Sequence, residues 1–110
     1  MNDTASAVQR RFKLGCMGQV PVGEGRRFLV GSLSVAVFRT RDGRIFATQA
    51  ECPHNRGPLF EGVAGAGRVI CPLHGHAFDL ATGEPLADCC GPLKTYPVQV
   101  NCEGEIFLDL

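Results

Sequence analysis

Short apolar runs separated by turn-forming residues dominate the first half of the chain. They are rich in Val, Leu, Ile and Phe, and two of the gaps between them hold Gly31-Ser32 and Asp42-Gly43. Asp-Gly between two such runs is a strong signal for a tight β-hairpin. The pattern therefore predicts a meander of short antiparallel strands. We expect these strands over residues 11–16, 27–30, 34–39 and 45–48.

The pattern stops between Glu51 and Gly67, where we expect a single long loop. Beyond it, apolar positions such as Ile106 and Leu108 again alternate at period two, as in half-buried strands. Pro97 lies inside one of these runs and suggests an edge strand or a bulge. The later strands are expected over residues 68–70, 76–80, 96–101 and 105–110, the last two as a hairpin. Because no helical period is sustained, the predicted class is all-β, with small antiparallel sheets forming a barrel or sandwich.

The chain length and composition predict one domain. The chain has 110 residues, and 45% of them are hydrophobic, which is ordinary for a folded domain. Residues 1–10 are small and polar and are expected to form a flexible tail, leaving 11–110 as the single domain. Eleven basic residues balance eleven acidic ones, so a strongly basic nucleic-acid-binding protein is excluded.

The sequence lacks the usual targeting signals. Its N-terminal stretch has no continuous apolar segment of a secretory signal, and no window reaches the roughly 20 apolar residues that span a bilayer. We therefore expect a cytoplasmic protein with no membrane partner. Because cytosolic thiols are mostly reduced, the six cysteines favour metal binding over disulfides.

Charge is distributed unevenly along the chain. Residues 1–44 carry eight basic and three acidic residues, whereas residues 45–110 carry three basic and eight acidic ones. This asymmetry is compatible with an ordinary solvated surface. It is also compatible with a dipole that orients the protein toward a charged partner.

Two short clusters carry the candidate chemistry. Cys52-Pro53-His54 is followed, after sixteen residues, by Cys71-Pro72-Leu73-His74. Two thiolates and two imidazoles can hold a tetrahedral zinc, or a [2Fe–2S] cluster with two Cys on one iron and two His on the other. A zinc finger usually pairs Cys with Cys and His with His, whereas each cluster here offers one of each. That separation of donors favours the two-iron cluster.

This arrangement resembles the Rieske iron–sulfur family. The resemblance covers residues 11–110 and includes Gly57-Pro58-Leu59, the segment 78–83 and Thr95-Tyr96-Pro97-Val98. It implies layers of β-strands with the two cluster-binding loops at one tip. It further implies one [2Fe–2S] cluster per chain, with Cys52 and Cys71 on the inner iron and His54 and His74 on the outer iron.

Comparison with other Rieske proteins suggests a low reduction potential. Those of cytochrome bc complexes carry a disulfide between the cluster loops, at positions that match Gly57 and Leu73 here. They also have a Ser, which bonds to a cluster sulfur, where this chain has His76. Fewer donors to the sulfurs mean a lower potential, so the chain resembles the ferredoxin-like class.

The resemblance implies a one-electron carrier that depends on redox protein partners and catalyses no reaction alone. The segments 36–43, 71–74 and 93–97 look most like the small subunit of assimilatory NAD(P)H-dependent nitrite reductase. The stand-alone ferredoxin of an aromatic-ring dioxygenase system is the alternative. A non-redox binding module held together by zinc is a more distant one.

Several residues beside the ligands are candidates for tuning the site. His76 is either an exposed or half-buried strand residue, or a group whose protonation changes the potential of the cluster. Arg56 stands where the family often has a small residue, and Pro72 stiffens its loop. Gly57 allows a tight turn that brings backbone N–H groups close to sulfur.

The other four cysteines are expected to be structural. Cys16 and Cys102 lie in or beside predicted strands and are expected to be small core residues. Cys89 and Cys90 are adjacent in a predicted loop, and we expect two thiols there because a disulfide between neighbours is strained. A redox-sensitive pair beside the cluster is the alternative.

Overall fold

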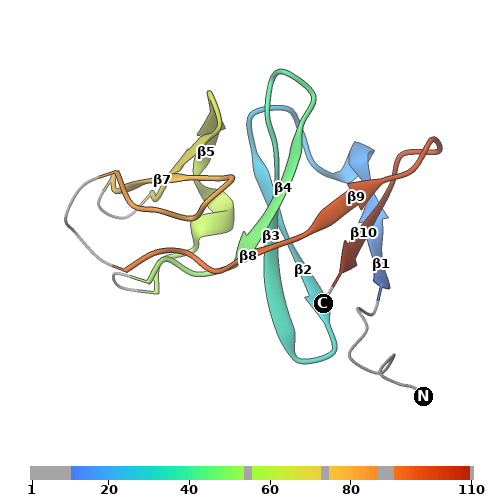
Figure 1. The fold of residues 1–110 in the computed structure, drawn as a ribbon, viewed down its shortest axis with the longest axis horizontal. Helices are drawn as coiled ribbons and strands as arrows, with labels where there is room; N and C mark the ends of the chain where they lie inside the picture. The colour runs from blue at the N-terminus through green and yellow to red at the C-terminus, as the bar shows by residue number, and fades with distance from the viewer. Residues whose placement is uncertain (1–10, 54–55, 73–74, 87–90, 110) are drawn as a thin grey trace, which may run out of the picture.

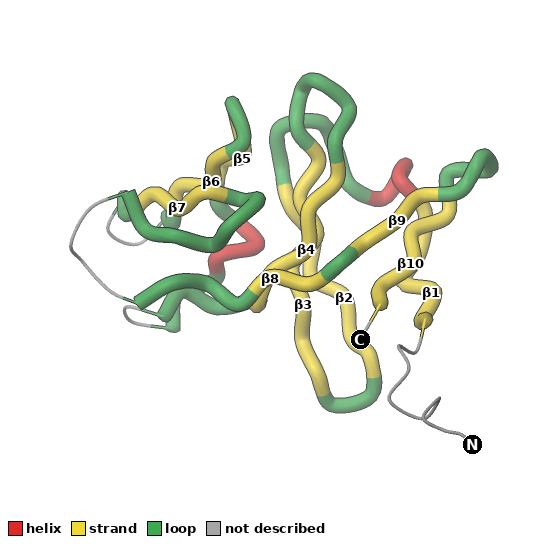
Figure 2. The backbone as a smooth tube through the Cα atoms, in the orientation of Figure 1, coloured by secondary structure: helices red, strands yellow, loops and turns green. Residues whose placement is uncertain are grey.

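The computed structural model of the chain describes residues 11–53, 56–72, 75–86 and 91–109. Within these ranges the fold is three small antiparallel sheets with two short 3₁₀ turns (Figures 1 and 2). The predicted all-β class is confirmed. No helix in the described part of the chain is long and apolar enough to cross a membrane.

The central sheet has the order β2-β3-β4-β8. Its members are β2 (Gly25–Val30), β3 (Leu33–Arg39), β4 (Ile45–Gln49) and β8 (Thr95–Tyr96). Both predicted hairpin turns are present, since β2 pairs with β3 and β3 with β4 in antiparallel register. Gly31 and Gly43 adopt positive φ angles there, of 63° and 86°, which glycine tolerates best.

Strand β3 is buried on both faces. Ala36 and Phe38 pack into one core cluster, while Val35 and Val37 pack into the other. Successive side chains of a strand point to opposite faces, so an apolar run without alternation fits a strand between two layers. The central sheet therefore separates two cores (Figure 1).

The second sheet has the order β1-β10-β9. It comprises β1 (Arg11–Cys16), which leads into the 3₁₀ turn η1 (Met17–Gln19), with β9 (Val98–Val100) and β10 (Glu105–Asp109). The prediction of one strand over 96–101 is wrong, because the chain is divided at Pro97. Tyr96 pairs with β4 in the central sheet and Val98 with β10 in this one. Proline has no N–H for a sheet hydrogen bond, which makes it a suitable crossing point.

The third sheet has the order β5-β6-β7 and carries the second candidate metal-binding loop between β6 and β7, whereas the first lies between β4 and the segment leading into this sheet. It comprises β5 (Val63–Gly65), β6 (Arg68–Ile70) and β7 (Ala77–Asp79), preceded by the 3₁₀ turn η2 (Leu59–Glu61). The expectation of one loop over 51–67 is therefore wrong. The Gly-rich end of this stretch forms strand β5, in which Ala64 is the buried residue.

The prediction that Cys16 and Cys102 are core residues is also wrong, because both are exposed. Cys16 ends β1, and Cys102 lies in the turn between β9 and β10. The core between the outer and central sheets is filled instead by larger side chains, including Val20, Ile106 and Leu108.

Candidate metal centre

The two candidate thiol ligands begin two loops at the same end of the molecule. Cys71 directly follows β6, and Cys52 follows an isolated antiparallel bridge between Glu51 and Pro58. Cys52 and Cys71 are each only 2% exposed and belong to one core cluster. That cluster includes Phe38, Leu59 and Phe78, so apolar side chains from different sheets shield both sulfurs.

Backbone hydrogen bonds give the two loops the same frame. The N–H of Cys52 donates to the carbonyl of Gly57 at 2.8 Å, and the N–H of Arg56 donates to the carbonyl of Cys52 at 2.8 Å. In the second loop the N–H of Cys71 donates to the carbonyl of His76 at 2.8 Å, and the N–H of Gly75 donates to Cys71 at 3.0 Å. The flanking pairs also correspond. They are Glu51 with Pro58 and Ile70 with Ala77.

The described ends of the segments 52–57 and 71–76 are therefore closed by the same pair of hydrogen bonds. Each segment has its fifth residue in the left-handed region, with φ of 54° at Arg56 and 73° at Gly75. Glycine adopts this conformation freely, whereas a side chain makes it strained. The first loop has arginine at the position where the second has glycine.

The described donors fit a mixed-ligand iron–sulfur cluster. The thiolate ligands of such a cluster need protection from water. The apolar core that surrounds both cysteine sulfurs supplies this protection. Each cysteine also occupies the same position in its loop, as the first residue, whose N–H bonds to the carbonyl of the sixth. His54 and His74 lie outside the described residues, as do Cys89 and Cys90.

The remaining candidates lie around the same two loops. Gly57 is buried and accepts the hydrogen bond from Cys52, whereas Pro72 and Arg56 are exposed. His76 is half-buried and faces Cys71 through its backbone carbonyl. His76 lies just before β7 rather than inside a strand as expected, and its role in tuning the potential stays a prediction.

The turn after β7 is held by an acidic side chain. The backbone N–H groups of Thr82 and Ala81 donate to Asp79 Oδ1 at 3.0 and 2.9 Å. The bond from Thr82 holds the pKa of the Asp79 carboxyl below its usual value. The turn then positions Gly83, whose carbonyl accepts from Leu93 at 2.7 Å and so fastens the returning chain to this sheet.

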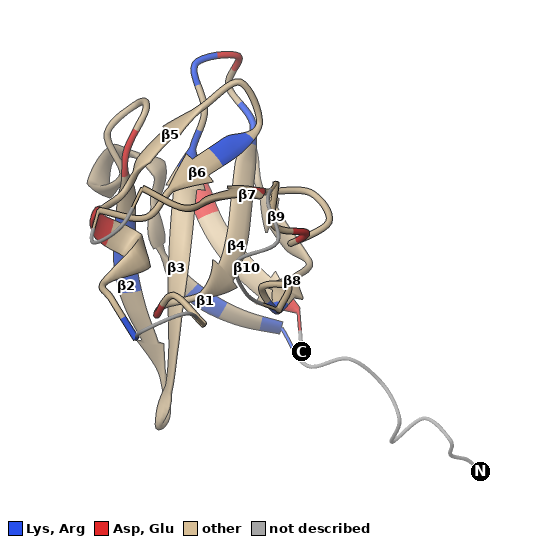
Figure 3. Ribbon diagram, turned by 90° about the vertical axis from the view of Figure 1, so that its left-hand side faces the viewer, with Lys and Arg blue, Asp and Glu red and all other residues tan. Residues whose placement is uncertain are grey.

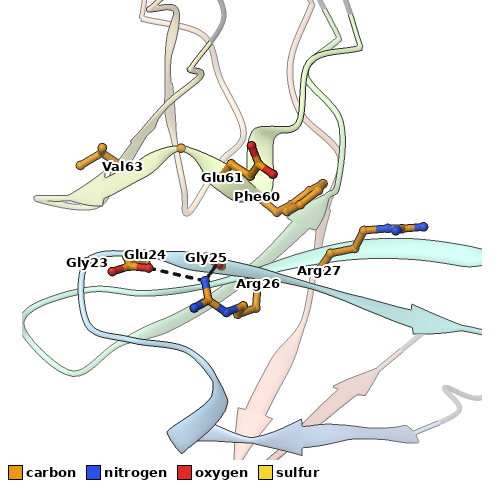
Figure 4. Close-up of a pocket in the computed structure, with 9 residues that line it drawn as sticks. Gly23, Glu24, Gly25, Arg26, Arg27, Phe60, Glu61 and Val63 are labelled. Atoms are coloured by element: carbon orange, nitrogen blue, oxygen red, sulfur yellow. Dashed lines mark hydrogen bonds and ion pairs between the residues drawn. The ribbon is translucent and has the colours of Figure 1, made fainter.

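A hollow of about 730 Å³ lies between β2 and the η2–β5 segment (Figure 4). Arg26 and Glu24 form an ion pair there at 3.5 Å, and the lining is otherwise mainly glycine, Arg27, Glu61 and apolar residues. The described lining contains no His, Cys or Ser, so it offers no nucleophile–base pair.

Sequence reasoning found the two cysteines but missed the equivalence of the loops. The two segments do not continue alike, because Pro58 leads into the 3₁₀ turn η2 whereas Ala77 begins β7, so the sequence after each loop gives no common signal. Arg56 also concealed the equivalence, since the pattern of glycines alone does not mark that position as left-handed.

Curated relatives of the chain are ferredoxin components. It is 34% identical over 108 residues to the anthranilate 1,2-dioxygenase ferredoxin subunit of Burkholderia cepacia, covering 97% of this chain and 98% of that protein. It is 38% identical over 80 residues to ferredoxin CarAc of Metapseudomonas resinovorans, covering 72% of this chain and 73% of that one.

Solved structures show the same fold. A Mycobacterium tuberculosis protein assigned as an NADH-dependent nitrite reductase small subunit matches with a TM-score of 0.84 at 26% identity, covering 94% of this chain and 96% of that one. The Sphingomonas yanoikuyae B1 ferredoxin matches with a TM-score of 0.80 at 32% identity, covering 92% and 99%. A sequence profile of the Rieske [2Fe-2S] domain matches residues 10–97. With its buried cysteine pair and matched loops, the chain therefore belongs to the Rieske [2Fe-2S] domain family.

Proposed function

We propose that the chain is a one-electron carrier whose [2Fe–2S] cluster is held by Cys52, His54, Cys71 and His74. The observation that carries this proposal is the pair of matched loops, each presenting a buried thiol from one core. A cluster bound there supplies reversible uptake and release of one electron. The family membership favours it over a structural zinc.

The chain contributes rigidity and shielding to this function. Leu59 and Phe78 exclude water from the thiols, which keeps the local dielectric constant low. The backbone bonds that close each loop fix the cysteine positions, so less rearrangement is needed when the charge of the site changes. His54 and His74 follow their cysteines by two and three residues and are proposed as the outer ligands.

An oxygenase is our first candidate for the electron acceptor. One relative, at 34% identity, is the ferredoxin subunit of an anthranilate 1,2-dioxygenase. A solved structure, also at 34% identity, is a complex of oxygenase and ferredoxin in carbazole 1,9a-dioxygenase. Nitrite reductase is the second candidate, because a protein assigned as its small subunit shares the fold with a TM-score of 0.84. Both fit a single Rieske domain over residues 11–110 that acts through redox protein partners.

The ligand assignment is tested by single substitutions in anaerobically purified protein. We expect Cys52→Ser and Cys71→Ser to lose the EPR signal of the reduced cluster, together with iron and sulfide. Cys16→Ser is the matched control, because that thiol is exposed, and it should retain all three. His54→Cys should change the g values, since it replaces a nitrogen ligand with sulfur. Unchanged spectra in either ligand-cysteine variant would refute the assignment.

The acceptor is tested with the chemically reduced wild-type protein. We expect it to reduce the oxygenase component of carbazole 1,9a-dioxygenase faster than the partner subunit of an NADH-dependent nitrite reductase. The reverse order would support the second candidate. A colourless protein with one zinc per chain, even after reconstitution with iron and sulfide, would exclude electron transfer.

A further inference from the structure

Strand register places a row of apolar side chains on the outer face of the third sheet. Val63 pairs with Ile70, and Ile70 pairs with Ala77. The row continues to Leu86, whose N–H donates to the carbonyl of Ala77 at 2.9 Å. Directly paired residues project on the same side of a sheet, so these four side chains form one strip. We call them the apolar row.

The apolar row is exposed, although its neighbours on the other face are buried. Val63, Ile70 and Leu86 are 65%, 46% and 47% exposed. By contrast, Val69 and Phe78, which alternate with row members, are fully buried in the core. Three of the five large hydrophobic residues with this exposure in the described chain thus fall on a single row. Such clustering marks an interaction surface more than scattered apolar residues do.

The apolar row lies at the base of the second candidate metal-binding loop. Ile70 directly precedes Cys71, and Ala77 directly follows His76. A partner covering the row would therefore lie beside that loop. Figure 3 looks onto this end of the molecule, where β5, β6 and β7 lie.

Charged residues on the same face show what kind of surface would fit. Two residues along the strands from the apolar row, and so on the same face, Arg68 pairs with Asp79, and the N–H of Asp79 bonds to the carbonyl of Glu84. Glu61 is exposed just before β5. Around Arg68, the carboxylates of Asp79 and Glu84 outnumber one guanidinium, so this edge of the row is acidic, whereas Glu61 and Val63 share a hollow with Arg26 and Arg27. A second copy of the chain would bring like charges together, whereas a surface rich in Lys and Arg would be attracted.

We propose that the apolar row is the docking surface for the electron-accepting protein, which presents an apolar patch bordered by Lys and Arg side chains. This proposal rests on the proposed electron-carrier function. The row is also small, with only four side chains. Stable interfaces bury about 800 Å² per partner, whereas transient redox complexes bury less. A small contact suits a carrier that must dissociate after each transfer.

The test compares Val63→Thr/Ile70→Thr/Leu86→Thr with Leu29→Thr. Leu29 is 61% exposed on β2, so its substitution removes a similar apolar side chain from another sheet. The reduced proteins are mixed with the oxygenase component of carbazole 1,9a-dioxygenase or the partner subunit of a nitrite reductase. One electron leaves the carrier and one enters the oxidised acceptor. We expect the triple variant to lower the second-order rate at least tenfold with the acceptor that wild type reduces.

Ferricyanide serves as a small acceptor that needs no docking surface. Its reduction should remain within twofold of wild type in both variants, and Leu29→Thr should transfer electrons normally to the protein acceptor. Glu61→Gln/Glu84→Gln should lower the rate mainly at low ionic strength, because attraction between exposed charges is screened by salt.

The outcomes separate the docking surface from the function. A triple variant with the wild-type rate toward its protein acceptor overturns the docking surface and leaves the carrier function intact. A wild type that reduces neither protein acceptor overturns both. Sedimentation showing a wild-type dimer that the triple substitution dissociates would assign the apolar row to self-association and overturn the proposal.

Discussion

At the scale of single residues, Arg56 is the feature that distinguishes the two loops. It holds a φ of 54° at the position where the second loop has Gly75 at 73°. A left-handed conformation costs a residue with a side chain about 1 kcal/mol or more. The first loop therefore stores strain that the second does not.

We expect Arg56→Gly to raise the free energy of unfolding by about 1 kcal/mol. Gly75→Ala should lower it by a similar amount, because the left-handed φ is strained for alanine and no described residue lies within 4 Å of the added carbon. Arg56→Gln removes the charge and keeps the strain, so it should match wild type. Chemical denaturation of the holo-protein measures all three. Equal stability of Arg56→Gly and Arg56→Gln would contradict the strain argument.

Gly62 allows a close backbone approach behind the second loop. A Cβ atom there would lie 2.2 Å from the carbonyl oxygen of Ile70, the residue before Cys71. We expect Gly62→Ala to destabilise the protein by about 1–3 kcal/mol through overpacking and to weaken cluster retention. Gly65→Ala is the control, because within the described ranges no atom lies within 4 Å of its added carbon. Thermal unfolding followed by visible absorbance distinguishes the two variants.

At the scale of elements, the turn after β7 depends on an ionised carboxylate. Hydrogen bonding in the fold lowers the pKa of Asp79 from its usual 3.8. A group whose pKa is lowered by folding stabilises the protein above its unfolded pKa and loses that contribution as pH falls through its folded pKa. This contribution should therefore disappear below about pH 4.

We expect Asp79→Asn to be less stable than wild type at neutral pH, because the amide oxygen accepts the same bonds without a charge. The difference should shrink as the pH is lowered below about 4. Glu51→Gln, which removes an exposed carboxylate elsewhere, controls for net charge. Urea unfolding from pH 3 to pH 7 provides the measurement. A difference that does not vary with pH would show that ionisation is not involved.

For the molecule as a whole, the two hydrophobic cores should differ in how far their stability depends on the bound metal cluster. Cys52 and Cys71 belong to one core, while the other, which includes Val35 and Ile106, lies between the outer and central sheets. Only the first core contains candidate ligands. Loss of the metal cluster should therefore destabilise the core on one face of β3 and leave the core on the other face intact.

We expect removal of the cluster by chelation under reducing conditions to abolish amide-exchange protection in β5, β6 and β7. Protection in β1, β3 and β10 should persist, because these strands pack around the second core. Hydrogen exchange with peptide-level readout tests this directly. Uniform loss of protection across the chain would mean that the two cores unfold as one unit.

The hairpins, the fold class and the candidate ligands could all be predicted from the amino-acid sequence. Local signals sufficed, because Asp42-Gly43 and period-two alternation act over a few residues. The candidate ligands Cys52 and Cys71 were visible from their spacing. The exposure of Cys16 was not, because an isolated thiol carries no signal that separates core from surface.

Which segments share a sheet or a core became visible only in the folded chain. The fold divided the chain at Pro97 between two sheets, formed β5 from a Gly-rich stretch, and placed Cys52 and Cys71 in one core. It also made the two loops equivalent and lined up the apolar row across strands. These features depend on pairing between residues far apart in the chain. Periodicity within one strand shows which side chains share a face, but it does not reveal what lies against that face.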